Sequence, residues 1–278
     1  MTTAELLRRI RTRLKPAFGE LAEADAELIL QYILNQSRTE LYVSSTKEVD
    51  TKTVERIENV VERRLNQEPL QYILGKAYFY DRDFLVNPKV LIPRPDTETL
   101  IETVLSAEPD KPCRFADIGT GSGILASVLT AQRPTWKAWG VDISFEALKT
   151  AARNCGPNVE LLNADMLSAF KQKKLFDFII SNPPYISACE MTRLERSVAE
   201  HEPQLALYGG EDGLDFYRVL SVNAPKHLRK DGHLYLEIGY DQGKSVPELL
   251  YHDGWIKISV ICDLARRPRV VKAQWANS

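Results

Sequence analysis

Closely spaced cysteines are absent from the sequence. Its 278 residues include four cysteines, with no Cys-x-x-Cys pair: Cys113, Cys155, Cys189 and Cys262. Zinc sites and disulfide frameworks both need cysteines at close or regular spacing, so we expect reduced thiols. The four histidines form no pair four residues apart around a glutamate. We therefore expect no bound metal.

Long apolar runs and a strong excess of one charge are also missing. No stretch approaches the roughly 20 apolar residues that span a bilayer, and the first residues do not resemble a signal peptide. We therefore expect a cytoplasmic protein with no membrane partner. The net charge is -2, with 44% hydrophobic and 27% charged residues. This balance is typical of a globular protein and disfavours direct binding to nucleic acid.

The N-terminal part of the sequence repeats apolar residues at helical spacing. Three separate stripes lie within residues 6–14, 28–33 and 54–65, which predicts separate short helices. Thr2 with Glu5 resembles a capping box, and Asp50 precedes the third stripe as a candidate N-cap. We predict a small helical bundle domain that ends near residue 70.

Aromatic and β-branched residues become frequent after the bundle. Residues 78–80 and 84–86 flank a polar turn at 81–83, which is typical of a β-hairpin. We predict a domain order of helical bundle over 1–70, hairpin connector over 71–92 and a larger domain over 93–278.

The larger domain alternates short apolar runs with helical patterns. A helix is expected from Asp96 to about Ala107, after two prolines that break regular structure. The runs predicted as strands are residues 114–118, 138–141, 159–162, 176–180, 233–238, 256–261 and 269–272. This alternation predicts an α/β fold, with a mainly parallel sheet and helices on both faces.

A glycine-rich loop follows the first predicted strand and opens a helix. It reads Asp117-Ile118-Gly119-Thr120-Gly121-Ser122-Gly123. Open α/β sheets bind nucleotides at this position. A dinucleotide fingerprint needs glycine three places after Gly121, where the chain has Ile124, so a dinucleotide is disfavoured. S-adenosylmethionine has no pyrophosphate and fits such a loop, and Asp117 could face its positively charged amino group.

Acidic residues end the next two predicted strands. Asp142 follows the second strand, where an acid in nucleoside-binding folds accepts the ribose hydroxyls. Asp165 follows the third strand and could bind the adenine amino group, while Met166 could pack on the ring. Alternatively, the glycine loop is only a tight turn and Asp142 caps a helix. The loop and both acids in this order favour cofactor binding.

The fourth predicted strand runs directly into Asn182-Pro183-Pro184-Tyr185. Proline has no N–H, so the carbonyls here are acceptors without a competing backbone donor. The Asn182 oxygen and the Pro183 carbonyl could each accept one hydrogen of an NH₂ group, while Tyr185 stacks on its planar neighbour. We predict these four residues as catalytic and substrate-binding, with Asn182 also contacting the cofactor. The alternative is a common turn after a strand.

With these motifs identified, the chain resembles the glutamine methyltransferases of peptide chain release factors, the PrmC/HemK family, over nearly its whole length. Other segments that carry the resemblance are residues 71–75, 92–98, 202–203, 205–207, 209–210, 212–214 and 263–265. The resemblance implies a class I, Rossmann-like, S-adenosylmethionine-dependent methyltransferase fold, with an N-terminal bundle and a connecting hairpin.

The resemblance also implies a substrate and site roles. The substrate is then the side-chain amide nitrogen of the glutamine in the Gly-Gly-Gln motif of release factors. Cofactor contacts carry over to residues 119–123, Asp142 and Met166, and substrate contacts to residues 182–185. Some relatives have an aromatic residue in place of Met166. Residues 265–269 differ from the usual glycine-containing form, and no role is attached to them.

Two other functions remain open on the residues alone. An adenine-specific nucleic acid methyltransferase could use the same pocket on the exocyclic amine of a flipped base. A binding module could keep the fold without catalysis. Outside the motifs, Arg94 could close the cofactor site or lie in a surface loop. Glu237 ends a predicted strand near the expected cleft, where capping or packing is the simpler interpretation.

Overall fold

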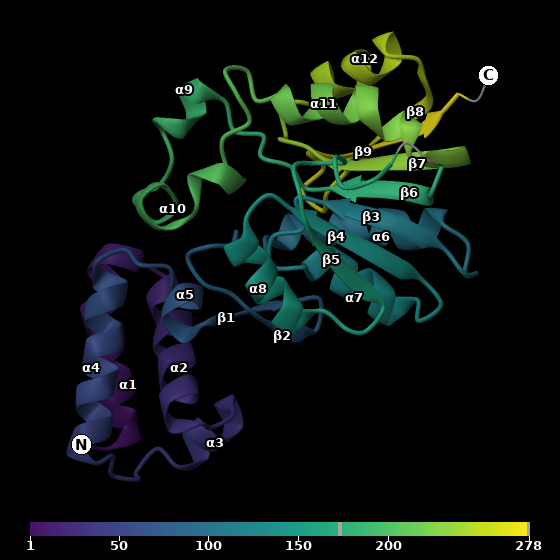
Figure 1. The fold of residues 1–278 in the computed structure, drawn as a ribbon. Helices are drawn as coiled ribbons and strands as arrows, with labels where there is room; N and C mark the ends of the chain where they lie inside the picture. The colour runs from purple at the N-terminus through teal and green to yellow at the C-terminus, as the bar shows by residue number, and fades with distance from the viewer. Residues whose placement is uncertain (172–173, 277–278) are drawn as a thin grey trace. The chain divides into compact units, whose positions relative to one another are not determined.

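The computed structural model describes residues 1–171 and 174–276, and these form two compact units. The first unit contains Met1–Gly75 together with Arg196–His201, and the second contains the rest of the described chain. Figure 1 shows the elements of both units. Each unit has its own buried core, so each is described separately.

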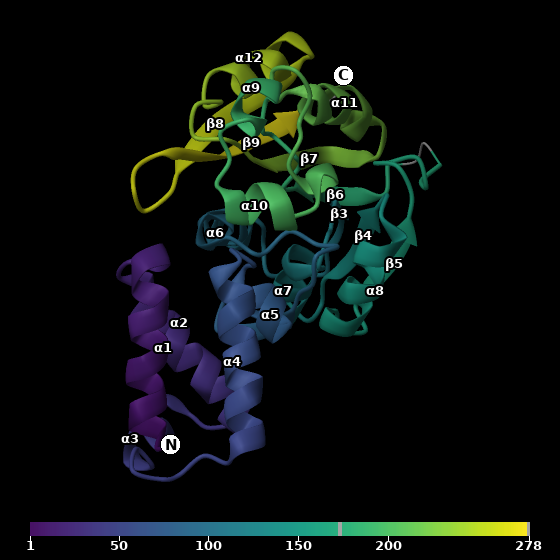
Figure 2. The ribbon, with the colours of Figure 1, turned by 90° about the vertical axis from the view of Figure 1, so that its left-hand side faces the viewer.

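The first unit is a helical bundle around a single apolar core. Its helices are α1 (Thr3–Phe18), α2 (Leu21–Leu34), α3 (Arg38–Val43), α4 (Thr51–Leu65), α5 (Leu70–Leu74) and α10 (Arg196–His201). Helices α1, α2 and α4 lie alongside one another (Figure 2), and the first and third predicted stripes pack into one core. Ile29 of the second stripe is buried there, but the prediction was wrong for Leu28 and Tyr32, which are exposed. Thr2 forms the predicted capping box with Glu5, and the Asp50 side chain accepts from Thr53 N, which confirms both caps.

A two-stranded hairpin begins the second unit. Its strands are β1 (Lys76–Phe79) and β2 (Arg82–Leu85), which pair antiparallel. The turn consists of Tyr80 and Asp81, both at positive φ, so the turn predicted at 81–83 was misplaced. In helix α6 (Glu98–Ala107), the Glu98 and Glu102 side chains accept hydrogen bonds from the Tyr80 N–H and hydroxyl, respectively. These contacts from a distant helix hold a tyrosine in a conformation that usually favours asparagine or glycine.

A seven-stranded sheet forms the centre of the second unit, in the order β5-β4-β3-β6-β7-β9-β8. Its strands are β3 (Arg114–Ile118), β4 (Lys137–Asp142), β5 (Val159–Asn163), β6 (Phe176–Ser181), β7 (Leu228–Glu237), β8 (Trp255–Cys262) and β9 (Pro268–Trp275). Neighbouring strands from β5 to β7 run parallel, and β9 runs antiparallel to β7 and β8. The mainly parallel sheet confirms the predicted α/β fold.

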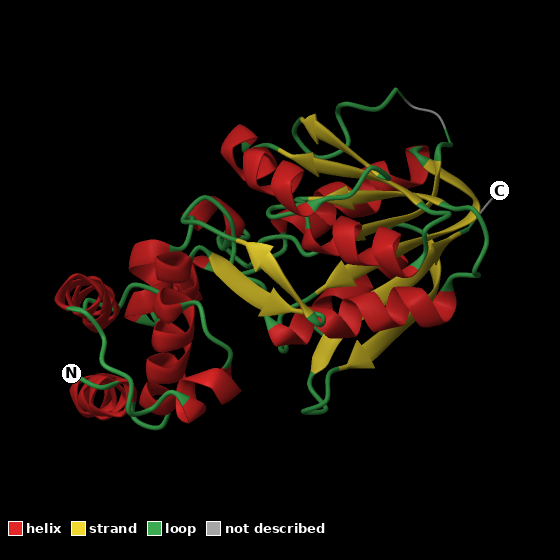
Figure 3. Ribbon diagram, turned by 90° about the horizontal axis from the view of Figure 1, so that it is seen from below, coloured by secondary structure: helices red, strands yellow, loops and turns green. Residues whose placement is uncertain are grey.

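Helices cover both faces of this sheet (Figure 3). They are α6 (Glu98–Ala107), α7 (Ile124–Gln132), α8 (Phe145–Asn154), α11 (Asp215–Asn223) and α12 (Ser245–His252), while the short helix α9 (Ala188–Met191) has no buried residue. Along β6, Phe178 and Ile180 join the core beneath α6 and α7, whereas Ile179 joins the core beneath α11 and α12. This alternation follows from the two-residue period of a strand and explains why residues 178–180 of β6 are all apolar.

Candidate active site

The candidate site lies where the order of the parallel strands changes direction. From β3 the chain moves outward to β4 and β5, and it then returns to β6 on the other side of β3. Loops that leave the carboxyl ends of β3 and β6 therefore diverge, which is where open α/β sheets bind ligands. A cavity of about 320 Å³ lies there, lined by both loops. Its size suits a small-molecule ligand.

The glycines of the loop after β3 are required for different structural reasons. Gly119 and Gly121 have φ of 70° and 54°, and both line the cavity. A Cβ on Gly119 would have no other heavy atom within 4 Å, and one on Gly121 would come no closer than 4.0 Å. These two glycines therefore keep space open above the backbone, and a ligand can approach it closely. Thr120 and Ser122 also line the cavity.

Gly123 faces the protein interior instead. Its φ is 78°, and a Cβ there would lie 2.6 Å from Cys155 Sγ and 3.1 Å from Ala151 Cβ. Gly123 therefore permits the close packing of the loop against α8 at its C-terminal end. The predicted role of Gly123 in cofactor contact stays a prediction, because Gly123 is not among the residues that line the cavity.

Asp142 lies at the end of β4 and lines the cavity. Its Oδ2 accepts from Gly121 N at 2.8 Å, and its Oδ1 accepts from Ser144 N at 2.8 Å. Burial raises the pKa of Asp142, and the two backbone N–H groups oppose that rise. The carboxylate thus ties the glycine loop to the strand end. Because each carboxylate oxygen has more than one acceptor site, Asp142 can still bind ligand hydroxyls.

Asp117 lies below the glycine loop, outside the set of residues that line the cavity. It is fully buried, and its Oδ2 accepts from Thr120 Oγ1 at 2.5 Å and from Ala126 N at 3.3 Å. Its Oδ1 has no hydrogen-bond partner among the described residues. Burial raises the pKa of Asp117 to about 7. Asp117 therefore shapes the loop from beneath, and its predicted contact with an amino group stays a prediction.

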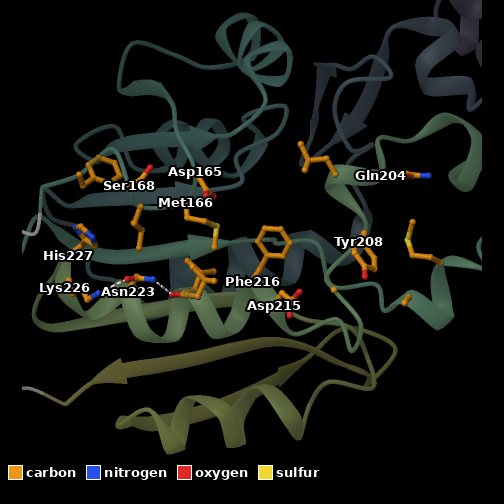
Figure 4. A pocket seen from close by; sticks show the side chains of 18 residues that line it. Asp165, Met166, Ser168, Gln204, Tyr208, Asp215, Phe216, Asn223, Lys226 and His227 are labelled. Atoms are coloured by element: carbon orange, nitrogen blue, oxygen red, sulfur yellow. Dashed lines mark hydrogen bonds between the residues drawn. The ribbon is translucent and has the colours of Figure 1, made fainter.

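Asp165 and Met166, which are predicted from the sequence to contact adenine, follow β5 and line the cavity. Met166 has a φ of 50°, unusual for a non-glycine residue. Both residues also border a second, larger cavity of about 1200 Å³, shown in Figure 4. Phe216 and Leu205 are likewise common to the two cavities. The smaller cavity therefore borders a wider one.

The Asn-Pro-Pro-Tyr segment forms the opposite wall. Asn182, Pro183 and Pro184 line the smaller cavity, and Asn182 Nδ2 donates to Thr97 Oγ1 at 3.3 Å. Tyr185 is not among the lining residues. It packs against the sheet core, its carbonyl accepts from Gln242 Nε2 at 3.2 Å, and burial raises its pKa to about 12. The structure thus brings three of the four predicted residues to the cavity and places Tyr185 behind them.

Several residues at the site received no firm role from the sequence. Arg94 and Thr97 line the cavity. Arg94 forms an ion pair with Glu202, whose side chain is 1% exposed and also accepts from Ile92 N at 3.3 Å. This pair ties the 92–94 segment to the loop before Pro203. Glu202 and the 92–98 segment belong to motifs noted in the sequence, which could have signalled the pair.

Glu237 ends β7 and is 1% exposed. The Thr97 and Asn182 side chains lie close enough to its carboxylate to oppose, by hydrogen bonding, the rise in pKa that burial causes. The expected capping or packing role stays a prediction, and these polar neighbours place Glu237 at the candidate site. Its position beside Asn182 depends on the β6–β7 pairing, which local sequence patterns do not reveal.

Two absences complete the site. Within residues 1–171 and 174–276, no group of three or more histidine, cysteine, aspartate or glutamate side chains could hold a metal ion. No helix in the described part of the chain is both long enough and apolar enough to cross a membrane.

Comparisons with known proteins match both units. The family profile described as PrmC N-terminal domain matches residues 5–75, and that described as Methyltransferase small domain matches residues 95–211. The release factor glutamine methyltransferase of Koribacter versatilis is 41% identical over 250 residues, which cover 88% of this chain and 89% of the relative. The protein of the same name from Nitratidesulfovibrio vulgaris is 36% identical over 280 residues, covering 98% and 95%.

Solved structures support the fold. The crystal structure of a methyltransferase from Pyrococcus furiosus matches with a TM-score of 0.54 over 79% of this chain and 100% of that chain. At 17% sequence identity, this likeness concerns the fold alone.

Proposed function

The chain belongs to the release factor glutamine methyltransferase family, and from this premise we propose that it methylates a glutamine side-chain amide nitrogen in peptide chain release factors. S-adenosylmethionine is the methyl donor, and the glutamine of a Gly-Gly-Gln motif is the acceptor. The observation that carries the proposal is that Asn182, Pro183 and Pro184 share one cavity with Gly119, Gly121 and Asp142.

The residues present fit this cofactor. Gly119 and Gly121 leave the loop backbone open to the ligand, as any Cβ there would project into free space. Asp142 is held by two backbone N–H groups and retains acceptor capacity for the ribose hydroxyls. Asp165 and Met166 lie at the adenine end of the proposed arrangement. When bound, S-adenosylmethionine supplies an electrophilic methyl group on a positively charged sulfur.

The residues of the opposite wall orient the acceptor. An amide nitrogen delocalises its lone pair and is a poor nucleophile, so its alignment with the methyl carbon must supply much of the rate. Orientation of this kind can contribute about 7 to 11 kcal/mol in favourable cases. The Asn182 oxygen and the Pro183 carbonyl accept the two amide hydrogens, and they stabilise the positive charge that develops on nitrogen. The alkylated nitrogen loses its proton late, so no strong base is needed.

Two surfaces are proposed to receive the protein substrate. The wider cavity that borders the cofactor cavity is large enough for residues that flank the glutamine. The helical bundle provides the more distant contacts, because a glutamine side chain has too few atoms to distinguish one protein from another. Binding energy from such remote contacts also helps to position the reacting nitrogen.

The experiment offers labelled S-adenosylmethionine with release factor, DNA and RNA in parallel, using the full chain and Asn182→Ala. We expect label on the release factor only, and loss of transfer in Asn182→Ala with most cofactor affinity retained, since the variant removes orientation rather than the cofactor cavity. Label on nucleic acid would instead support the adenine methyltransferase. A near-normal single-turnover rate in Asn182→Ala would refute the role of Asn182.

A further inference from the structure

Glu237 is next to Asn182 because of how β6 and β7 pair. The two strands are parallel, and Ser181 pairs with Leu236. Asn182 and Glu237 are the residues that follow this pair, so the sheet register delivers the two side chains to the same place at the carboxyl edge. Glu237 is 1% exposed, and its neighbours are therefore protein groups rather than bulk water.

Few of those neighbours compensate the carboxylate. The Glu237 Oε2 atom has no hydrogen-bond partner among the described residues. Arg269 is the nearby cation, but it already pairs with Asp96 at 2.9 Å and with Asp263 at 3.3 Å. A buried carboxylate with incomplete pairing costs folding free energy. An apolar side chain of similar size would serve packing better, so packing does not explain a glutamate here.

The contacts of Glu237 suggest what the carboxylate does. The Thr97 and Asn182 side chains lie close enough to the carboxylate to lower its pKa, and Asn182 Nδ2 donates to Thr97 Oγ1 at 3.3 Å. A primary amide has a donor end and an acceptor end of nearly equal shape, so packing alone does not distinguish its two orientations. An ionised carboxylate only accepts hydrogen bonds, so it selects the NH₂ end of the Asn182 amide.

We propose that Glu237 is a positioning residue that holds the Asn182 NH₂ group and thereby turns the Asn182 oxygen toward the acceptor nitrogen. This inference rests on the proposed amide methylation, in which Asn182 must accept a hydrogen from the substrate. Thr97 completes the arrangement, since it accepts from Asn182 and its own hydroxyl hydrogen is free to point at the carboxylate. Glu237 itself does not touch substrate.

The test compares Glu237→Gln with the full-length wild type on release factor. Glutamine keeps the size of the side chain but adds a donor, which can bind the Asn182 oxygen and reverse the amide. A hydrogen bond to a charged group contributes about 1.5 to 3 kcal/mol, so we expect kcat to fall about 10- to 100-fold. The KM for release factor and the Kd for S-adenosylmethionine should stay within about threefold, since no binding contact is removed.

Two further variants sharpen the test. Glu237→Asp keeps an ionised, acceptor-only group, and we expect it to recover part of the lost kcat. Glu108→Gln is the matched control, because Glu108 is also buried and hydrogen-bonded, to His233 and Tyr235. It lies outside both cavities, so it should keep wild-type kcat.

The pH profile gives a readout that a merely structural role would not change. Burial raises the pKa of Glu237 to about 7, and the titratable or charged groups that face it are Asp96, Arg269, Tyr185 and Tyr217. A protonated Glu237 can donate to the Asn182 oxygen and reverse the amide. Wild-type kcat should therefore fall as the pH drops below about 7, and Glu237→Gln should lose this dependence.

The outcomes separate the inference from the proposed function. If wild type does not methylate release factor, the proposed function fails before Glu237 is tested. If wild type is active and Glu237→Gln keeps kcat within about twofold, positioning by Glu237 is wrong. The inference is also overturned if Glu237→Gln melts well below wild type and loses cofactor affinity together with kcat, because that pattern belongs to a structural role. Calorimetry and thermal melting provide both controls.

Discussion

Asp142 has two roles, because it anchors the glycine loop and also lines the ligand cavity. Replacing it with alanine removes the proposed acceptor for the ribose hydroxyls and also releases Gly121 N. At about 1.5 to 3 kcal/mol per hydrogen bond to a charged group, Asp142→Ala should raise the Kd for S-adenosylmethionine at least about tenfold. Titration calorimetry measures this change. Asp177→Ala is a control, since Asp177 pairs with Arg229 and lines neither cavity. Unchanged affinity in a folded Asp142→Ala would contradict the assignment.

Asp117 should make stability depend on pH in a particular direction. Burial raises its pKa from 3.8 to about 7 in the folded protein, so the native state binds the proton more tightly than the unfolded state. The contribution of Asp117 to the free energy of unfolding therefore falls as the pH rises from about 3.8 to about 7. Above about 7 the destabilisation by the buried charge is complete. Asp117→Asn removes the charge and should raise the Tm relative to wild type at about pH 8, with a smaller gain at about pH 5.

Thermal melting at the two pH values checks the Asp117 prediction. An equal change in Tm at both values would mean that the charge is not the cause. The comparison requires the same buffer ionic strength, because screening alters other ion pairs on the surface.

At the scale of elements, the contact between the glycine loop and α8 depends on Gly123. A Cβ there would meet Cys155 Sγ at 2.6 Å and Ala151 Cβ at 3.1 Å, at a φ of 78°. Gly123→Ala must therefore displace α8 and adopt a strained backbone, at a cost of about 1 to 3 kcal/mol or more. Gly156→Ala is the matched control because a Cβ there has no neighbour within 4 Å. Denaturant unfolding should show a loss of stability for Gly123→Ala only, and equal stability of both variants would refute the packing role.

Local patterns predicted most elements but not those that depend on distant contacts. The stripes of the bundle and the apolar runs of the sheet are repeated features, so α1, α2, α4 and the strands of the main sheet were found. Helices α3 and α5 were not predicted, because six and five residues are too few to show a helical repeat. The hairpin turn was misplaced because Tyr80 is held by Glu98 and Glu102 of α6, which no local signal indicates.

At the scale of the whole molecule, the helical bundle is expected to recognise the protein substrate. Removal of residues 1–75 should spare S-adenosylmethionine binding, because every residue that lines the cofactor cavity lies in the second unit. The same deletion should greatly reduce methylation of intact release factor, while a short Gly-Gly-Gln peptide should be a poor substrate for both forms. Calorimetry on the truncated protein shows whether it remains folded and binds cofactor. Equal rates on whole release factor would make the bundle a stabilising appendage.

The candidate site as a whole was only partly predictable from the sequence. The glycine loop, Asp142 and Asn182 were identifiable because residues of the appropriate chemistry follow successive predicted strands in short sequence motifs. The positions of Asp117 and Tyr185 behind the cavity wall were not, since a motif does not specify which of its side chains turn inward. Glu237 and Arg94 acquire their surroundings from strand register and from an ion pair with Glu202, and both are properties of the assembled fold.

The most direct test is tandem mass spectrometry of a release factor incubated with the full-length protein and S-adenosylmethionine. The account predicts one added methyl group, located on the side-chain nitrogen of the glutamine in the Gly-Gly-Gln motif, and no modification when that glutamine is replaced by glutamate. A methyl group on a lysine, an arginine or another glutamine, or an unmodified release factor beside an enzyme that binds cofactor, would contradict it.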